Sequence, residues 1–433
     1  MYIHIALSLV GLMLTQTDDL PKNANPHAIF GYSVEPDWDQ RLTITVGPKK
    51  ADLVGTGDRV IQSAVDYVAR LGGGTAHILP GTYKLRNSIF LQSKVRLLGS
   101  GTDSVLLKEP SVTTKLIMDG DHWDQEVTLA DHKGFQVGDG VRLVSEDPHG
   151  KGDNIIQRTL IASLGNRFKL DRRLSERFHL VGNPKIATNF ALLQCTNISD
   201  VVIENIALDG NKAHNDMIDK GMFDDGSIRL DESNRITIRK MTVRDFYCDG
   251  IVWGISHDVL VEDCNLYDGV RLAIHSGSGS QRSIVRGNHV RHCGEGVYFC
   301  WGAQHGLYER NVIEDCTYGM TLGHSDSDNL IRDNDILRSG EAGIHFRGGN
   351  KAFAPHRNRI ERNRIIDSGG EKGVAIDING ETESVMVIKN ELRETREPLS
   401  RIGILIGSET SDIRCEDNQI DGFDIPIKDL RKA

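Results

Sequence analysis

The chain has 433 residues, a formal net charge of −10, 45 glycines and only 6% aromatic side chains. This composition argues against a nucleic-acid partner, because no basic stripe or aromatic-basic platform accompanies the acidic balance. Abundant glycine with few aromatics suits tight turns between short strands more than a helical bundle.

The first residues have the pattern of a secretory leader. Ile3 to Leu14 form a short apolar run that is followed by the polar residues Thr15 to Asp19. The run is too short to span a bilayer, and no other stretch is apolar enough for a membrane helix. We therefore predict a signal peptide over 1–17 and a secreted or periplasmic protein.

One amphipathic helix is predicted ahead of the first strands. Apolar residues recur at helical spacing (Ile61, Ala64, Val65, Val68 and Leu71), with Asp58 as the expected N-cap and the glycines 72–74 as the stop. Strand-and-turn patterns follow at 75–83 and 95–101. A helix in this position would cover the open end of a first coil, whose edge would otherwise template aggregation.

The run GTGDRVIQSAVDYVARLGGGTAHILPGTYKL resembles the N-terminal signature of the pectate-lyase-like superfamily of right-handed parallel β-helices. That superfamily includes polysaccharide lyases, uronate epimerases, polygalacturonase-type hydrolases and phage tailspikes. The resemblance implies the architecture and a carbohydrate substrate. It leaves the activity open, because a fold does not dictate a function.

One sequence pattern repeats through the second half of the chain. A small polar residue, often Asn, is followed by x and an aliphatic, then by a turn and Gly-aliphatic-x-aliphatic. Spacings of 23, 24, 23 and 23 residues separate Met241, Cys264, Asn288, Asn311 and Asn334. A fixed period that contains short strands indicates a β-solenoid, in which each repeat is one coil.

The predicted fold is therefore all-β: a right-handed, single-stranded parallel β-helix with an N-terminal capping helix and a small β-rich insertion. We expect a leader at 1–17, the cap and first coils at 18–118, the insertion at 119–192 and the main β-helix at 193–433. The insertion has strand and turn residues without the coil period. It could wall one side of a groove, bind substrate or be purely structural.

The alternation of the repeat predicts which side chains face outward. In Gly-aliphatic-x-aliphatic the aliphatic residues face inward, so x and the residue after the second aliphatic face out. The first outward column is then Arg229, Val252, Ala273, Tyr298, Thr321, His345, Ala375 and Leu405, and the second is Asp231, Gly254, His275, Cys300, Gly323, Arg347, Asp377 and Gly407.

Polar and titratable groups concentrate in the middle coils. Any one of them is most simply a solvated surface residue, but several in consecutive coils favour a groove that binds a polysaccharide. A local groove can hold an anionic polymer despite the acidic whole chain. The residues expected to bind substrate are His275, Thr321, His324, Asp377, Trp301, Arg229 and Asp231.

Three residues fit β-elimination or C5 epimerisation of a uronate. Such chemistry needs a cation beside the carboxylate, a base for the α-proton and an acid. Arg347 is the predicted cation and His345 the base, two residues or about 7 Å away on the same strand face. Tyr298, two coils or about 10 Å away, is the predicted acid.

A glycoside hydrolase is the alternative. Hydrolysis needs two carboxyl groups roughly 5–10 Å apart, whereas the outward Asp231 and Asp377 are six coils or roughly 29 Å apart. The loop residues Asp224, Asp225, Asp326 and Asp328 keep this alternative open. A non-catalytic carbohydrate-binding or surface β-helix is the third hypothesis.

Cofactor and cysteine patterns are less specific. The stretch 325–328 (Ser-Asp-Ser-Asp) could supply Ca²⁺ ligands or be a solvated turn. Seven cysteines argue against a full disulfide framework. Cys293 and Cys316 occupy the same place in successive coils, either in a buried column of small side chains or as a disulfide.

Overall fold

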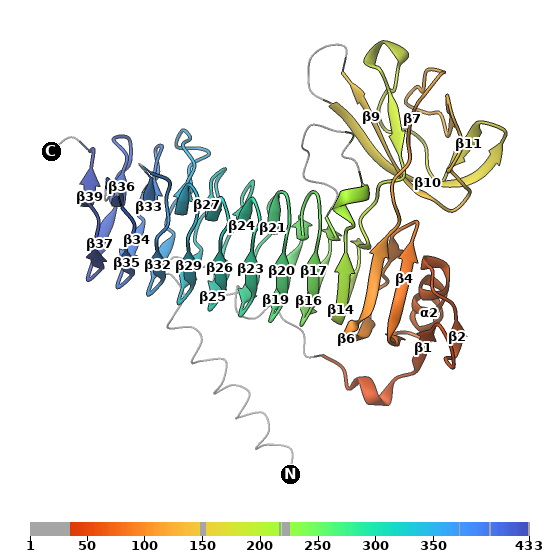
Figure 1. The fold of residues 1–433 in the computed structure, drawn as a ribbon, viewed down its shortest axis with the longest axis horizontal. Coiled ribbons are helices and arrows are strands. Elements are labelled where there is room, and N and C mark those ends of the chain that lie inside the picture. The colour runs from red at the N-terminus through yellow and green to blue at the C-terminus, as the bar shows by residue number, and fades with distance from the viewer. Residues whose placement is uncertain are drawn as a thin grey trace.

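The computed structural model describes residues 35–147, 153–215, 218, 226–371, 373–397 and 400–431. The predicted leader over 1–17 lies outside these residues, as do Asp224 and Asp225. The described chain forms a long parallel solenoid, with a smaller β-sheet beside its N-terminal coils (Figure 1). Among the described residues, no helix is both long and apolar enough to cross a membrane.

Each regular coil contributes one strand to an 11-stranded sheet and two strands to a 22-stranded sheet. The 11-stranded sheet contains β5 (Ile89–Phe90), β13 (Leu193–Thr196), β15 (Ile228–Asp231), β18 (Ile251–Gly254), β21 (Leu272–Ser276), β24 (Glu295–Phe299), β27 (Tyr318–Leu322), β30 (Ala342–Phe346), β33 (Val374–Ile378), β36 (Ile402–Ile406) and β39 (Ile425–Asp429). Its strands pair in parallel from coil to coil, which confirms the predicted winding.

The 22-stranded sheet begins with β1 (Thr43–Gly47), β2 (Leu53–Val54), β3 (Gly74–Ile78), β4 (Gly81–Leu85), β6 (Val95–Lys108) and β14 (Ser199–Asp209). Two short strands per coil then follow: β16 (Asn234–Arg239) with β17 (Thr242–Arg244), β19 (His257–Glu262) with β20 (Asn265–Tyr267), β22 (Ile284–Arg286) with β23 (His289–Arg291), β25 (Leu307–Glu309) with β26 (Val312–Glu314), β28 (Leu330–Arg332) with β29 (Asp335–Leu337), β31 (Arg359–Glu361) with β32 (Arg364–Ile366), β34 (Met386–Ile388) with β35 (Glu391–Arg393), and β37 (Arg414–Glu416) with β38 (Gln419–Asp421).

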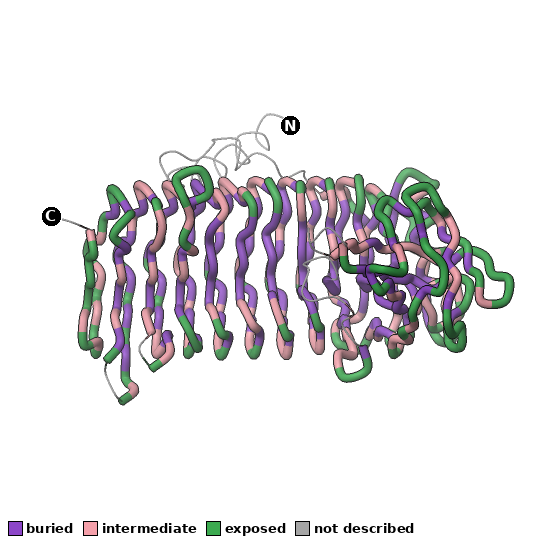
Figure 2. The backbone as a smooth tube through the Cα atoms, turned by 90° about the horizontal axis from the view of Figure 1, so that it is seen from above, coloured by how far each residue is buried: buried purple, intermediate pink, exposed green. Residues whose placement is uncertain are grey.

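The interior is a continuous apolar column, seen as buried stretches in successive coils in Figure 2. In the 11-stranded sheet, one row of inward side chains runs through Ile251, Ile274, Val297, Met320 and Ile344, all fully buried and paired in register. Burial of aliphatic side chains in every coil supplies the main stabilisation of the stack.

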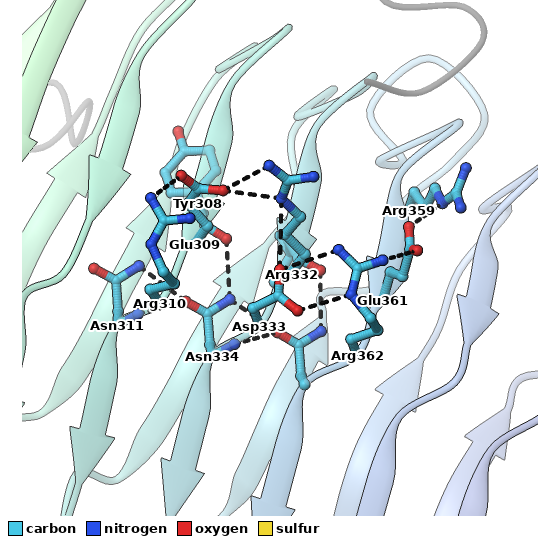
Figure 3. Close-up of polar contacts among 12 residues, drawn as sticks. Tyr308, Glu309, Arg310, Asn311, Arg332, Asp333, Asn334, Arg359, Glu361 and Arg362 are labelled. Atoms are coloured by element: carbon cyan, nitrogen blue, oxygen red, sulfur yellow. Dashed lines mark hydrogen bonds and ion pairs between the residues drawn. The ribbon is translucent and has the colours of Figure 1, made fainter. Parts of the chain in front are cut away.

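Buried asparagines form a hydrogen-bonded ladder at the turn between the two strands of each coil. The backbone N–H of Asn311 donates to Oδ1 of Asn334 at 3.0 Å, and Asn334 Nδ2 donates to the carbonyl of Tyr308 at 3.0 Å (Figure 3). The same contacts recur at Asn288, Asn363, Asn390 and Asn418. These side chains satisfy backbone groups that the turn would otherwise bury unpaired.

The outer face of the 22-stranded sheet carries charges that alternate in sign. Paired positions in successive coils read Glu204, Arg239, Glu262, Arg286, Glu309, Arg332 and Glu361. Arg332 Nη2 lies 2.8 Å from Glu309 Oε2, and Arg286 Nη2 lies 2.7 Å from Glu262 Oε2 (Figure 3 shows the former pair). A one-coil slip would bring like charges together, so this row specifies register.

The capping helix is α2 (Asp58–Arg70), which packs beside β1 and β2 at the end of the stack (Figure 1). Ile61, Ala64, Val65 and Val68 are buried as predicted. Two details of the prediction are wrong. Gly57 is the N-cap and Asp58 the first helical residue, while Leu71 lies beyond the last turn with 59% of its surface exposed.

The smaller sheet has its own apolar core and lies beside the N-terminal coils (Figure 1). Its strands are β7 (Thr113–Lys115), β8 (Glu126–Thr128), β9 (Gly140–Glu146), β10 (Asp153–Leu164), β11 (Arg167–Leu170) and β12 (Lys185–Ala187). Short 3₁₀ turns occur at Trp38–Gln40, Leu180–Gly182 and Lys212–His214. Gln157 and Arg158 of β10 share a small depression with Phe90 and Gln194, so this sheet adjoins the first strands of the 11-stranded sheet.

All seven cysteines are free. Cys293 and Cys316 are 5% and 2% exposed, and Cys316 Sγ lies 3.5 Å from the Glu314 carbonyl. Of the two interpretations of this pair, the buried column of small side chains is confirmed. The disulfide is not formed.

Candidate active site

The outer face of the 11-stranded sheet carries one row of side chains, which we call the outer row. Strand pairing aligns its members in consecutive coils: Arg229, Val252, His275, Tyr298, Thr321, His345, Asp377 and Leu405. Neighbouring strands lie about 4.8 Å apart, so the five residues from His275 to Asp377 span roughly 19 Å. Five polar side chains are thus stacked side by side.

The predicted columns are wrong in two coils. Ala273 and Ala375 were expected to face outward, yet both are fully buried in the core. They occupy the inward position that Gly296, Gly319 and Gly343 hold in the other coils. His275 and Asp377 therefore move from the second column to the outer row, which brings them beside Tyr298 and His345 respectively.

His345 and Asp377 form a hydrogen-bonded pair. His345 Nδ1 lies 3.0 Å from Asp377 Oδ2 across adjacent strands. The Tyr318 ring lies against the imidazole, with 5.3 Å between centroids. With Nδ1 held by a carboxylate, the neutral imidazole presents Nε2 as its proton acceptor, the arrangement that general-base catalysis uses.

Arg347 lies back across the sheet instead of extending into solvent. Its guanidinium carbon is 4.4 Å from the centroid of the Tyr298 ring, and Nη1 donates to the Tyr298 hydroxyl. Nη2 donates to the carbonyl of Phe299 at 2.7 Å. The expectation of a solvent-pointing Arg347 is therefore wrong. The guanidinium also lies over Gly323, where a Cβ would lie 2.5 Å from Arg347 Nε.

Tyr298 and His275 are more enclosed than expected for a surface row. Tyr298 is 7% exposed and His275 is 4% exposed. His275 Nδ1 lies 2.8 Å from Oδ2 of the buried Asp249, and its ring meets Tyr298 edge-on with 5.1 Å between centroids. Burial raises the pKa of Tyr298, and the charge of Arg347 acts in the opposite direction. Tyr298 is thus a protonated donor at neutral pH.

Glu295 is a functional candidate that the sequence analysis missed. It precedes Gly296 at the start of β24, and it interacts electrostatically with Arg347, His345 and His275. Burial raises its pKa, while the Thr321 hydroxyl and those three charges lower it. The outward columns were assigned from the pattern Gly-aliphatic-x-aliphatic, which starts at Gly296 and so leaves Glu295 out. The residue that precedes the glycine of each coil could have been examined in the same way.

A cleft of about 310 Å³ lies next to this cluster, over β15, β18 and β21. Arg229 and Asp231 line one part of it, with Arg229 Nε 2.7 Å from Asp231 Oδ2. Trp301 lines another part and is 56% exposed. His324 stacks on Trp301 at 4.7 Å between centroids with 25° between the ring planes. An exposed indole beside a cation and a carboxylate suits the flat face and hydroxyl edge of a sugar.

The chain matches the family model described as "Right handed beta helix region" over residues 226–392. This match supplies the handedness of the winding. The chain is a right-handed parallel β-helix. No curated protein sequence matches it significantly.

Solved β-helix structures resemble this one over most of their length. They include an exopolygalacturonase from Thermotoga maritima, with 12% identity, a TM-score of 0.54 and coverage of 90% of this chain and 91% of that one. The mannuronan C-5 epimerase A-module from Azotobacter vinelandii has 13% identity, a TM-score of 0.53 and coverage of 88% and 97%. The Streptococcus pneumoniae surface adhesin PfbA has 13% identity, a TM-score of 0.53 and coverage of 85% and 83%. At these identities the likeness establishes the fold alone.

The ten residues singled out from the sequence fall into two adjoining groups on this β-helix. The first, which with Glu295 we call the polar cluster, contains His275, Tyr298, Thr321, His345, Arg347 and Asp377. The second surrounds the cleft and contains Arg229, Asp231, Trp301 and, stacked on it, His324. His275 lines the cleft as well, so it joins the groups.

The loop at 325–328 is not the solvated turn expected of an unliganded Asp-Ser-Asp sequence. Asp326 is fully buried and Asp328 is 5% exposed. Asp326 accepts backbone N–H groups, and Asp328 holds Arg357 through two hydrogen bonds of 2.8 Å. Among the residues that the structure describes, no group of three or more His, Cys, Asp or Glu is arranged to hold a metal ion.

Proposed function

We propose that the protein is a secreted or periplasmic enzyme that acts on an acidic polysaccharide, by β-elimination or C5 epimerisation of a uronate residue bound on the polar cluster. The observation that carries this proposal is the His345–Asp377 pair on the same strand face as Arg347. The fold is shared with proteins named as a mannuronan C-5 epimerase and an exopolygalacturonase, which is compatible with such a substrate.

In the proposed reaction His345 Nε2 takes the C5 proton of the uronate. Arg347 stabilises the negative charge that develops on the carboxylate. For elimination, the electron pair forms the C4–C5 double bond, the C4–O bond breaks, and Tyr298 protonates the leaving oxygen. For epimerisation, a proton returns to C5 from the opposite face, with Tyr298 as the donor. The raised pKa of Tyr298 suits an acid that must stay protonated until that step.

The cleft would bind the neighbouring sugar residues. Ile255 and Trp301 stand at the same corner of coils two strands apart, each with a positive φ (49° and 54°) and 56% exposed. Their spacing of about 10 Å fits a polymer that runs along the stack with roughly one sugar per coil. Both are large apolar side chains exposed beside the cleft, which supports a binding role.

The test is incubation with alginate, polygalacturonate and glycosaminoglycans. Elimination gives unsaturated products that absorb in the ultraviolet, and epimerisation exchanges the C5 proton for deuterium, which NMR detects. We expect one of these with the wild-type chain and its loss in His345→Ala. Lys428→Ala, in the same row but beyond the polar cluster, is the control that should retain activity. Absence of both products with every anionic polymer would contradict the proposal.

A hydrolase is the second candidate, because two carboxylates outside the predicted outward columns lie in one row. Strand pairing aligns Glu295 with Leu272, and extending the β18–β21 register two residues before Ile251 aligns Leu272 with Asp249. This row places the two carboxylates about 10 Å apart, near the 6.5–9.5 Å range of inverting glycosidases. A buried carboxyl of raised pKa, such as Glu295, suits a general acid. New reducing ends without ultraviolet absorbance, lost in Glu295→Gln, would favour this candidate. Binding with neither product would instead favour a non-catalytic role.

A further inference from the structure

Asp326 connects two consecutive turns that carry the aromatic side of the cleft. Its Oδ1 accepts the backbone N–H of Gly302 at 3.0 Å and of Ala303 at 2.9 Å, directly after Trp301. Its Oδ2 accepts the N–H of Gly323 at 2.9 Å, directly before His324. One fully buried carboxylate thus bridges the turn of Trp301 and the turn of His324.

The same carboxylate reaches the polar cluster. Arg347 Nη2 lies 3.6 Å from Asp326 Oδ2 while its other contacts hold Tyr298 and the Phe299 carbonyl. The Arg347 side chain is only 20% exposed, and a guanidinium that has lost most of its contact with water needs a counter-charge to offset its desolvation. Asp326 is the carboxylate next to it.

We infer that Asp326 is a positioning residue, which fixes the stacked Trp301–His324 pair over the cleft and holds Arg347 beside Tyr298, so that its protonation loosens both together. The inference rests on the proposed function for its effect on substrate, but the geometry it describes can be measured without any carbohydrate.

The backbone of both turns explains why such a tie is needed. Trp301 has φ 54° and His324 has φ 45°, conformations that are unfavourable for bulky side chains. Residues held in such regions persist only where surrounding contacts determine them. The two turns would relax if the three N–H bonds to Asp326 weakened.

The charge state of Asp326 is poised to change near neutral pH. Burial raises the pKa of Asp326 to about 7, while the N–H groups of Gly323, Ala303 and Gly302 and the charge of Arg347 act against that rise. Burial raises the pKa of the Cys300 thiol and of the Tyr308 hydroxyl, and the charge of Asp326 adds to both rises. A neutral carboxyl is a weaker acceptor for three donors and no longer balances Arg347.

The first experiment measures the environment of Trp301 without substrate. The Trp301 contribution to near-ultraviolet circular dichroism is the difference between a protein and its Trp301→Phe counterpart. We expect Asp326→Asn to reduce this signal by more than half, because its amide opposes at least one of the three N–H donors. Asp328→Asn in the same loop, which weakens the contacts to Arg357, should leave it unchanged. An unchanged Trp301 signal in a folded Asp326→Asn protein would overturn the inference.

The second experiment needs no variant of Asp326. In the His324→Gln background, which removes the neighbouring imidazole, the Trp301 signal should change once between pH 5 and 9, with a midpoint around the value of 7 given by burial. A signal that stays constant over this range would also overturn the inference. The last measurement is oligosaccharide affinity, which we expect Asp326→Asn to weaken by roughly tenfold. If the Trp301 signal depends on Asp326 but no carbohydrate binds, the proposed function fails and this inference stands.

Discussion

Replacing one internal asparagine of the ladder tests what holds the coils in register. Asn334 is 1% exposed, and its side chain takes part in four hydrogen bonds. Its Oδ1 accepts from the backbone N–H and from Nδ2 of Asn311, at 3.0 and 2.9 Å. Its Nδ2 donates to the Tyr308 carbonyl at 3.0 Å and to Asn363 Oδ1 at 2.8 Å. Asn334→Ala removes all four.

The expected cost follows from these contacts. Each buried hydrogen bond contributes roughly 1 kcal/mol net, and an abandoned buried donor or acceptor costs about 1–3 kcal/mol. Four lost bonds, with partial relaxation of the turn, give a loss of about 4 kcal/mol. Asn418 is the matched control at the C-terminal end of the ladder. It makes three ladder bonds but is only partly buried, so water can replace them, and Asn418→Ala should cost about 1 kcal/mol or less.

Urea unfolding of the two variants and the wild type, followed by far-ultraviolet circular dichroism, measures the difference. We expect the free energy of unfolding to fall about 3 kcal/mol further in Asn334→Ala than in Asn418→Ala, with a similar m-value. Equal losses in the two variants would refute the reasoning. The packing of the asparagine side chains would then account for their contribution to the free energy of unfolding, and the burial of their hydrogen bonds would not.

Three further predictions concern the site, the charged row and the cysteines. His345→Ala should lower turnover by roughly 10²–10⁴-fold, and Asp377→Asn by less, with an altered pH profile, because His345 loses its orienting carboxylate; steady-state kinetics against pH checks both. Glu309→Gln should reduce the free energy of unfolding by about 3 kcal/mol, measured in urea, because the 3% exposed carboxylate faces Arg310 and Arg332. Dithiothreitol should leave the thermal midpoint unchanged, because all seven cysteines are free; a drop on reduction would reveal a disulfide.

The winding could be predicted from the sequence because a solenoid repeats one local pattern. Every coil must place aliphatic side chains inside and a turn residue at the same corner, so the repeat period is visible in the amino-acid sequence. The asparagine ladder was predictable for the same reason. The recurring small polar position of the repeat holds its members, and their side chains from Asn288 to Asn418 satisfy backbone groups of the turn.

The outward face was harder to predict, because the pattern was anchored on glycine. In two coils Ala273 and Ala375 stand in place of that glycine. The predicted outward position was therefore two residues too early there, and His275 and Asp377 were assigned to the wrong column. Side-chain reach was a second obstacle. Strand alternation indicates where Arg347 leaves the backbone, but not that its long side chain folds back over Gly323 to Tyr298.

The two sheets differ in how fully their outer polar groups are satisfied, and this difference favours one face for function. On the 22-stranded sheet, charges of opposite sign in adjacent coils bind one another. On the 11-stranded side, Glu295 Oε2, Asp377 Oδ1 and His324 Nδ1 are buried and accept or donate no hydrogen bond among the described residues. Such groups cost free energy, and a sequence that needed only a stable stack would pair them as it does on the other sheet. Their concentration around the polar cluster and the cleft therefore favours this face, and not that of the 22-stranded sheet, as the functional one.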